Sequence, residues 1–113
     1  MPYISAKDDR REKLRNGEPA LIAGELNYQI FYYVKHAEKI DKLIIIDFVE
    51  QFLGDKPSYQ KYNDMTGALI RCCVEIKRRL NKDADFLIDI AASYDEEIAI
   101  YEDKKIIENG DVE

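Results

Sequence analysis

The chain has 113 residues, of which 46% are hydrophobic and 35% charged, and its formal net charge is -6. This length suits one domain, and the apolar fraction can fill a core, which excludes a disordered chain. Residues 82–113 hold eleven acids and three lysines, a net charge of -8, which leaves +2 on residues 1–81. Because phosphate contacts need a positive surface, we expect no general binding of nucleic acid.

The N-terminal residues 1–17 predict a short arm followed by a short helix. Residues 1–4 are apolar and suit an extended arm. Ser5 can cap a charged helix over residues 6–15, which Asn16-Gly17 would end. The charges of this helix alternate in sign, which favours a solvated helix over a binding arm.

A second helix is predicted over residues 20–39, since Pro19 is tolerated in a first turn. Four apolar positions recur there at helical spacing: Leu26, Ile30, Tyr33 and Ala37. Gly24 is unfavourable inside a helix, so we expect either a later start or a second backbone packed against it. His36 has no identifiable nucleophile or carboxylate partner, which favours a role at the helix end over one as a general base.

A third helix is predicted over residues 42–53, with Asp41 as its cap. Its apolar residues cover well over half of its circumference: Leu43, Ile44, Ile45, Ile46, Phe48, Val49, Phe52 and Leu53. The run of isoleucines could also form a strand, but the length and the flanking polar residues favour a helix. A helix that is apolar nearly all round is buried on several sides or shared with another subunit.

A fourth helix follows the turn 54–57, is capped by Ser58 and ends at residues 81–83. Its apolar positions form one stripe: Tyr59, Tyr62, Met65, Leu69, Cys73, Ile76 and Leu80. Gly67 in its interior predicts a close approach of another helix. Residues 84–113 are predicted to be helical, with a break near Ala92-Ser93 and with Gly110 as a C-terminal cap residue in the left-handed conformation.

These elements predict an all-α fold, a single small domain over residues 1–113 built as a bundle of about five helices. Its N-terminal part is the arm and short helix of residues 1–17, and its C-terminal part is the acidic segment 82–113. No apolar run approaches the ~20 residues of a membrane span, and no signal peptide is evident. We therefore expect a cytoplasmic protein that makes no contact with membranes.

The adjacent cysteines Cys72 and Cys73 point about 100° apart on a helix, so they cannot easily bridge to each other. We expect buried, unreactive thiols in a reducing compartment. One histidine and no second thiol cluster predict no metal site and no cofactor. The carboxylates near Glu96 and Glu97 have no matching set upstream, which argues against magnesium catalysis.

One set of polar and aromatic residues could form a ligand-binding site: Asn27, Tyr59, Tyr62, Asn63, Arg78 and Arg79. An arginine would bind a phosphate or carboxylate group of the ligand, and a tyrosine would stack on a ring of the ligand. The favoured alternative is structural: the asparagines bond to helix ends, and the arginines pair with the acidic tail. The basic cluster that begins at Lys77 could also touch DNA, but it lacks helix-turn-helix spacing.

Eight tyrosines exceed what one core of this size can use. Tyrosine is enriched at interfaces because it buries area and keeps a polar group. Because three tyrosines of the second helix cannot all face one core, we expect a self-association surface on the second and third helices. The expected interface residues are Tyr28, Tyr32, Ile45, Phe48 and Phe52.

Several short blocks carry a resemblance to a known family. They are Met1-Pro2-Tyr3-Ile4, Gly24-Glu25-Leu26-Asn27-Tyr28, Lys56-Pro57-Ser58-Tyr59, Tyr62-Asn63-Asp64, Gly67-Ala68-Leu69, Glu75, Arg78-Arg79, and the tail YEDKKIIENGDV at 101–112. The chain resembles an uncharacterised family of small proteins found mainly in tailed phages and related prokaryotic sequences. Relative to that pattern, residues 81–100 look inserted. The resemblance implies a phage or prokaryotic origin, and it brings no known activity.

These observations favour a small non-enzymatic binding protein, which forms a homo-oligomer and occupies a partner surface such as that of a host protein, in the host cytoplasm if it is phage-encoded. The alternative is a protein that binds a small anion or a nucleotide in the pocket of arginine, tyrosine and asparagine, and sequesters or hydrolyses it. No catalytic residue is identified on either interpretation.

Overall fold

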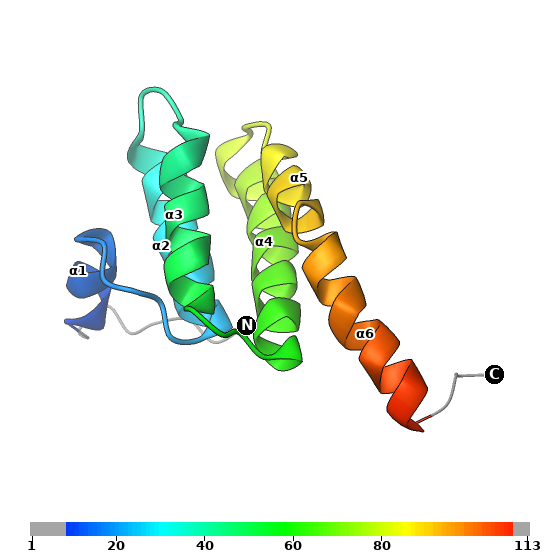
Figure 1. Cartoon of the computed structure of the whole chain (residues 1–113). Coiled ribbons are helices and arrows are strands. Elements are labelled where there is room, and N and C mark those ends of the chain that lie inside the picture. The colour runs from blue at the N-terminus through cyan, green and yellow to red at the C-terminus, as the bar shows by residue number, and fades with distance from the viewer. Residues whose placement is uncertain (1–8, 110–113) are drawn as a thin grey trace.

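The computed structural model describes residues 9–109, which fold into six helices and no strand (Figure 1). The helices are α1 Arg10–Arg15, α2 Ala23–His36, α3 Lys42–Leu53, α4 Tyr59–Leu80, α5 Phe86–Ala92 and α6 Asp95–Asn109. The all-α fold is therefore confirmed. The predicted break after α5 is also confirmed, and it raises the number of helices to six. The expected arm at residues 1–4, the helix start at residue 6 and the cap at Gly110 lie outside the described residues.

Three helix boundaries follow directly from local chemistry. The Asp41 side chain accepts a hydrogen bond from the Leu43 amide at 3.0 Å, and Ser58 Oγ accepts one from the Lys61 amide at 3.1 Å. Each bond satisfies one of the free amides at a helix start, so both predicted caps are confirmed. Helix α1 ends before Gly17, whose φ of 95° lies in the region that favours glycine.

Helix α2 is shorter than the predicted range 20–39. It begins at Ala23, after Ile22 in extended conformation, and it ends at His36. Gly24 therefore lies in the first turn, where amides have no intrahelical partner to lose and glycine costs less than in a helix interior. The alternative in which the helix begins after Gly24 was therefore wrong, because the helix begins one residue before it.

The long helix α4 is the centre of the bundle and packs against α2, α3 and α5 (Figure 1). One side of α4 is fully buried, and its residues are Met65, Leu69, Cys72 and Ile76. Fully buried side chains of the neighbouring helices belong to the same core: Leu26, Ile30 and Val34 from α2, Ile45 and Val49 from α3, and Leu87 from α5. Burying each large apolar side chain contributes about 1.5–3 kcal/mol, so this core is the main source of stability.

Two of the expected interface residues on α3 are part of this core. Ile45 is fully buried and Phe52 is 3% exposed, so neither side chain is available to a partner. The prediction that they form an interface was wrong because α3 buries these residues within its own chain. The exposed large apolar residues of α3 are instead Leu43 and Ile44 at the start of the helix, which are 72% and 39% exposed.

Gly67 has no close helical neighbour, contrary to the prediction. It lies on the exposed side of α4, and a Cβ added to it would meet no atom within 4 Å. No steric reason among the described residues therefore requires glycine at this position.

Substitution of Gly67 by alanine should raise the free energy of unfolding by about 0.5–1 kcal/mol, because alanine loses less backbone entropy in a helix. Urea denaturation at low micromolar concentration measures this change, with Ala68→Gly in the same helix as a control of opposite sign. A decrease for Gly67→Ala would mean that another segment packs against residue 67.

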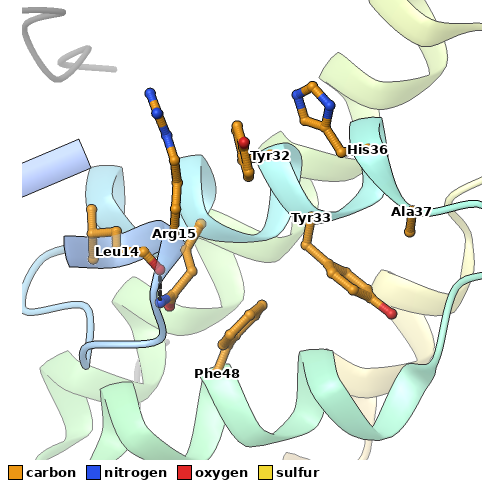
Figure 2. A pocket seen from close by; sticks show the side chains of 8 residues that line it. Leu14, Arg15, Tyr32, Tyr33, His36, Ala37 and Phe48 are labelled. Atoms are coloured by element: carbon orange, nitrogen blue, oxygen red, sulfur yellow. Dashed lines mark hydrogen bonds between the residues drawn. The ribbon is translucent and has the colours of Figure 1, made fainter. Parts of the chain in front are cut away.

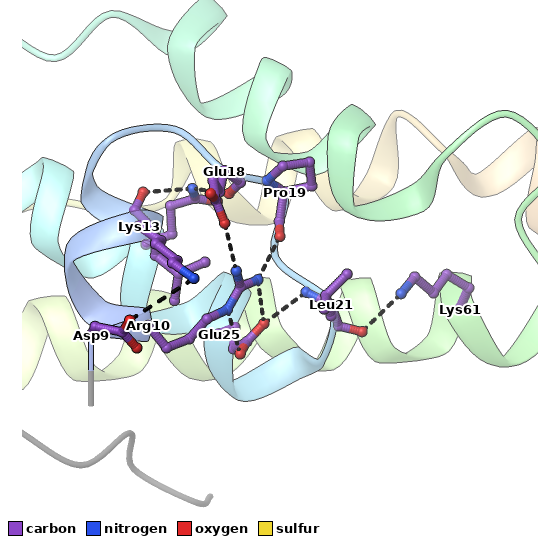
Figure 3. Close-up of polar contacts among 10 residues, drawn as sticks. Asp9, Arg10, Lys13, Glu18, Pro19, Leu21, Glu25 and Lys61 are labelled. Carbon is purple, nitrogen blue, oxygen red and sulfur yellow. Dashed lines mark hydrogen bonds and ion pairs between the residues drawn. The ribbon is translucent and has the colours of Figure 1, made fainter. Parts of the chain in front are cut away.

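A network of hydrogen bonds and ion pairs connects α1 to the start of α2 (Figure 3). Arg10 donates two hydrogen bonds of 2.9 Å to the Glu25 carboxylate, one to Glu18 at 2.9 Å and one to the Pro19 carbonyl at 2.7 Å. Glu25 also accepts from the Leu21 amide at 2.9 Å, and the Leu21 carbonyl accepts from Lys61 of α4 at 3.0 Å. This network explains why the chain is extended before α2 and begins the helix at residue 23.

The paired guanidinium of Arg10 lowers the pKa of Glu25 below its usual value of about 4.3. A carboxyl whose pKa is lower in the folded state stabilises the fold above its unfolded pKa, and this contribution is lost as the pH falls through the folded value. Glu25→Gln should therefore cost about 1–3 kcal/mol at pH 7 and much less near pH 2. Thermal unfolding of both proteins from pH 7 to pH 2 measures the difference, and a difference independent of pH would contradict this account.

Candidate functional site

The residues predicted to form an arginine–tyrosine pocket do not come together. Tyr59, Tyr62 and Asn63 lie at the start of α4, and Arg78 and Arg79 lie at its end. Arg78 follows Tyr62 by sixteen positions, which at a rise of 1.5 Å per residue separates them by about 24 Å along the helix, and no small ligand could bridge that distance. The prediction that these side chains form one pocket was therefore wrong.

The tyrosines of this set hold the C-terminal helices in place. Tyr62 is buried, with its ring centroid 5.9 Å from that of Tyr101 and 6.2 Å from that of Tyr94. The Tyr101 hydroxyl donates a 2.8 Å hydrogen bond to the Pro57 carbonyl. Burial raises the pKa of Tyr62, so its hydroxyl stays protonated at neutral pH. These rings join α6 to the start of α4.

Arg79 and Asn27 lie at the contact between α2 and α4. The Arg79 guanidinium lies 4.7 Å from the Phe31 ring centroid and 3.9 Å from the buried Glu75 carboxylate. Asn27 is buried, and its side-chain nitrogen has no hydrogen-bond partner among the described residues. Arg79 makes no ion pair with the described part of the acidic C-terminal segment, so the structural alternative, which paired the arginines with that segment, is not seen for Arg79 among the described residues.

The tyrosine-rich side of α2 is partly covered by arginines of α1. The guanidinium of Arg11 lies 5.2 Å from the Tyr28 ring centroid, and that of Arg15 lies 4.9 Å from the Tyr32 centroid. Arg15 also donates a 2.8 Å hydrogen bond to the Tyr28 hydroxyl. Both tyrosines are therefore half-buried within the chain, which leaves less of them for a partner than the sequence suggested.

The two cysteines are buried on the inner side of α4 and are free thiols. Burial raises the pKa of both, so neither forms the reactive thiolate at neutral pH. Among the side chains that the structure describes, no group of three or more His, Cys, Asp or Glu residues could hold a metal ion.

In the folded protein, both thiols should react with iodoacetamide at pH 8 at least about 100-fold more slowly than a free cysteine, because reaction requires unfolding. Mass spectrometry against time measures the rate, and the same protein in guanidinium chloride gives the reference. Fast labelling of either residue in the native protein would contradict the burial.

The exposed side of α4 carries a strip of apolar and basic residues, which we call the outer face of α4: Asn63, Gly67, Ile70, Arg71, Val74 and Arg78. Ile70 and Val74 are each 47% exposed. Arg71 and Arg78 make no ion pair or hydrogen bond with another described residue. These arginines are seven residues apart, which places them about 10 Å apart along the helix.

Helix α6 has an exposed strip of the opposite charge, which we call the outer face of α6: Glu96, Ile100, Asp103 and Ile107. Ile100 is 69% exposed and Ile107 is 84% exposed. Only the first part of α6 lies against α4, through Ile98 and Tyr101, and the helix then runs away from the bundle (Figure 1). Glu96 and Asp103 are also seven residues apart, or about 10 Å.

The two outer faces therefore match in charge and in spacing. Each has a pair of exposed apolar side chains beside two charges about 10 Å apart, with basic charges on α4 and acidic charges on α6. Both faces are exposed in the single chain, so they do not cover each other there. The spacing was readable in the sequence, but the exposure of Ile70, Val74, Ile100 and Ile107 required the fold.

Compared with protein-family models, with curated proteins and with solved structures, the chain has no match. No helix within residues 9–109 has the length and apolar composition needed to cross a bilayer.

Proposed function

We propose that the chain is a small, non-enzymatic binding protein that self-associates by placing α6 of one copy along the outer face of α4 of another. The observation that carries this proposal is the match between two exposed faces of opposite charge and equal spacing. Ile100 and Ile107 of one copy would cover Ile70 and Val74 of the other. Glu96 and Asp103 would lie beside Arg71 and Arg78.

The energetics favour a combined apolar and charged contact. An isolated surface ion pair contributes about 0–1 kcal/mol, which is too little to hold two proteins together. Exposed isoleucines contribute more when covered, at about 25 cal/mol for each Å² of apolar area. The charges then select the partner face and its direction, as is usual at interfaces.

A two-fold arrangement would use the contact twice. If α6 of each copy lies on α4 of the other, both pairs of outer faces are covered and the assembly closes as a dimer. Two such contacts double the buried area, which helps a small chain to reach the ~1,200 Å² that is typical of specific interfaces. We therefore propose a homodimer with reciprocal α6 contacts.

The biological setting is also part of the proposal. The resemblance of residues 1–4 and 101–112 to phage proteins supports a phage or prokaryotic origin, and two free thiols in the chain support a reducing cytoplasm. A protein of this kind would act by occupying a partner such as a host protein. The same outer faces are the surfaces on which we expect that partner to bind.

Charge reversal provides a test that does not depend on loss of folding. The double variant Arg71→Glu and Arg78→Glu should be monomeric, because two acidic faces would then meet. The variant Glu96→Arg and Asp103→Arg should be monomeric for the same reason. A mixture of the two variants should form a heterodimer, because each α6 then meets an α4 of opposite charge. Light scattering coupled to size-exclusion chromatography measures the mass of each sample.

The matched control is Lys39→Glu and Lys42→Glu, which makes the same change in net charge at exposed positions outside both outer faces. It should leave the mass of the wild-type assembly unchanged. A wild-type protein that stays monomeric at about 100 µM would contradict the proposed function, since specific homodimers commonly bind more tightly than this. A dimer that survives both charge reversals would contradict the assigned faces.

A further inference from the structure

Three aromatic residues of α2 are partly exposed and belong to neither outer face: Tyr28, Phe31 and Tyr32. The ring centroids of Tyr28 and Tyr32 are 6.1 Å apart. Figure 2 shows Tyr32 on one side of α2, while Tyr33 points to the other side, toward Phe48 of α3. This part of α2 is therefore a row of rings that the core covers only in part.

An arginine from a neighbouring helix lies over each of these rings. The pairs, with the distance from the guanidinium carbon to the ring centroid, are Arg11–Tyr28 at 5.2 Å, Arg15–Tyr32 at 4.9 Å and Arg79–Phe31 at 4.7 Å. Arg15 comes from α1 and Arg79 from α4, so two different helices bring arginines to α2. Both of these arginines are exposed, so the edge and the outer flat side of each guanidinium can bind a ligand.

A lysine completes this surface, which we call the stacked face: Arg11, Arg15, Tyr28, Phe31, Tyr32, Lys35 and Arg79. Lys35 follows Phe31 by four positions and Tyr32 by three, so it is a neighbour of both on the surface of α2. It is exposed and makes no ion pair or hydrogen bond with another described residue. Arg15 uses its Nε to bond Tyr28, and its terminal nitrogens have no hydrogen-bond partner among the described residues.

Two acidic residues lie near the stacked face without neutralising it. Glu75 is 3.9 Å from Arg79, but it is only 5% exposed. Glu12 of α1 attracts Arg15, but no hydrogen bond or ion pair joins the two. Cations gathered in this way repel one another, and an anion placed among them offsets that repulsion. The stacked face is therefore suited to a ligand with several negative charges.

The helix dipole explains only part of this arrangement. Lys35 and Arg79 lie in the last turns of α2 and α4, where the dipole favours cations. That effect requires neither a ring under each guanidinium nor the approach of Arg15 from a different helix. Flat stacked groups beside uncompensated positive charge match a ligand that combines flat rings with negative charge.

We propose that the stacked face binds single-stranded nucleic acid. Phosphates of the strand would lie beside Arg15, Lys35 and Arg79. Bases would stack on the outer flat sides of the guanidinium groups, since arginine planes and aromatic rings are the usual platforms for unpaired bases. The net charge of the chain argues against general binding of nucleic acid, but the fold gathers these cations from three helices on one surface. A single strand is favoured over a duplex, because α2 lies between α1 and α4 and does not project as a helix that enters the major groove.

Four fluorescent probes of about twelve units, a length within the range of known single-strand sites, separate stacking from charge. They are oligothymidylate, oligouridylate, an abasic DNA strand and oligoglutamate. Fluorescence anisotropy at low salt should give a Kd below about 100 µM for a strand with bases, and the tighter of the two such strands identifies the partner as DNA or RNA. The abasic strand and oligoglutamate should bind at least about fivefold more weakly, because neither can stack. Three phosphate contacts should give a slope of about -2 for the logarithm of the association constant against that of the salt concentration.

Two variants and a matched control complete the test. Lys35→Gln should weaken the strand with bases at least about threefold and reduce the slope to about -1.4. Lys56→Gln removes the same charge in the exposed turn before α4, whose start is about 30 Å from Arg79, and it should change neither value. Arg15→Lys keeps the charge but loses the flat guanidinium, so it should reduce the preference over the abasic strand and leave the slope near -2. Circular dichroism and thermal unfolding establish that each variant is folded.

The proposal is overturned if neither strand with bases binds saturably. It is also overturned if oligoglutamate binds as tightly as they do, since the stacked face would then accept an acidic protein segment, or if Lys35→Gln and Lys56→Gln weaken binding equally. No residue of the stacked face belongs to the two outer faces, so light scattering should give the wild-type mass for Lys35→Gln. A monomer that binds the strands would contradict the proposed dimer alone, and a dimer that binds no strand would contradict the stacked face alone.

Discussion

The structure depends on the burial of one side of α4 between three other helices. Met65, Leu69, Cys72 and Ile76 lie on that side without solvent exposure, and α2, α3 and α5 contribute the side chains that cover them. The start of α6 also contacts α4, so four of the other described helices pack against it. Because packing in such a core is dense, the position of α4 determines where α2 and α3 lie, and hence which side of α2 stays exposed between α1 and α4.

The same constraint leaves the other side of α4 without a cover in the single chain. A helix that buries a stripe on one side usually exposes polar residues on the other. Here the exposed side carries Ile70 and Val74 beside two arginines, and α6 exposes Ile100 and Ile107 beside two acids. The acids of the sequence are concentrated in residues 82–113, and this uneven distribution places acidic and basic residues on two different exposed faces. These two faces are the ones that we propose to meet between copies.

Local features of the sequence predicted the helices well. The caps at Asp41 and Ser58, the end of α1 at Asn16-Gly17 and the break after α5 all depend on hydrogen bonds or backbone preferences within a few residues. Periodicity also identified the buried stripe of α4. It could not say which helix covers a given stripe, and for that reason Ile45 and Phe52 were placed at an interface and Gly67 at a close contact.

The candidate sites were predicted less well, and for two different reasons. The prediction that grouped Tyr62 with Arg78 did not take the rise of the helix into account. That rise alone separates the two residues by about 24 Å. The stacked face could not be found from the sequence, since it requires α1 to fold back on α2. That contact depends on the Arg10–Glu25 ion pair between residues fifteen positions apart. An arginine beside an aromatic ring, the chemistry expected of a site, occurs at Arg11 and Tyr28, at Arg15 and Tyr32, and at Arg79 and Phe31.

Amide hydrogen exchange most directly tests the claim that α4 organises the molecule. At low protein concentration, the amides of residues 65–76 should be the slowest to exchange and should open only with global unfolding, while those of the second half of α6 should exchange quickly. At high concentration, protection of α6 should rise if a second copy covers it. If the amides of α4 exchanged as fast as those of α6, the central role of α4 would be contradicted.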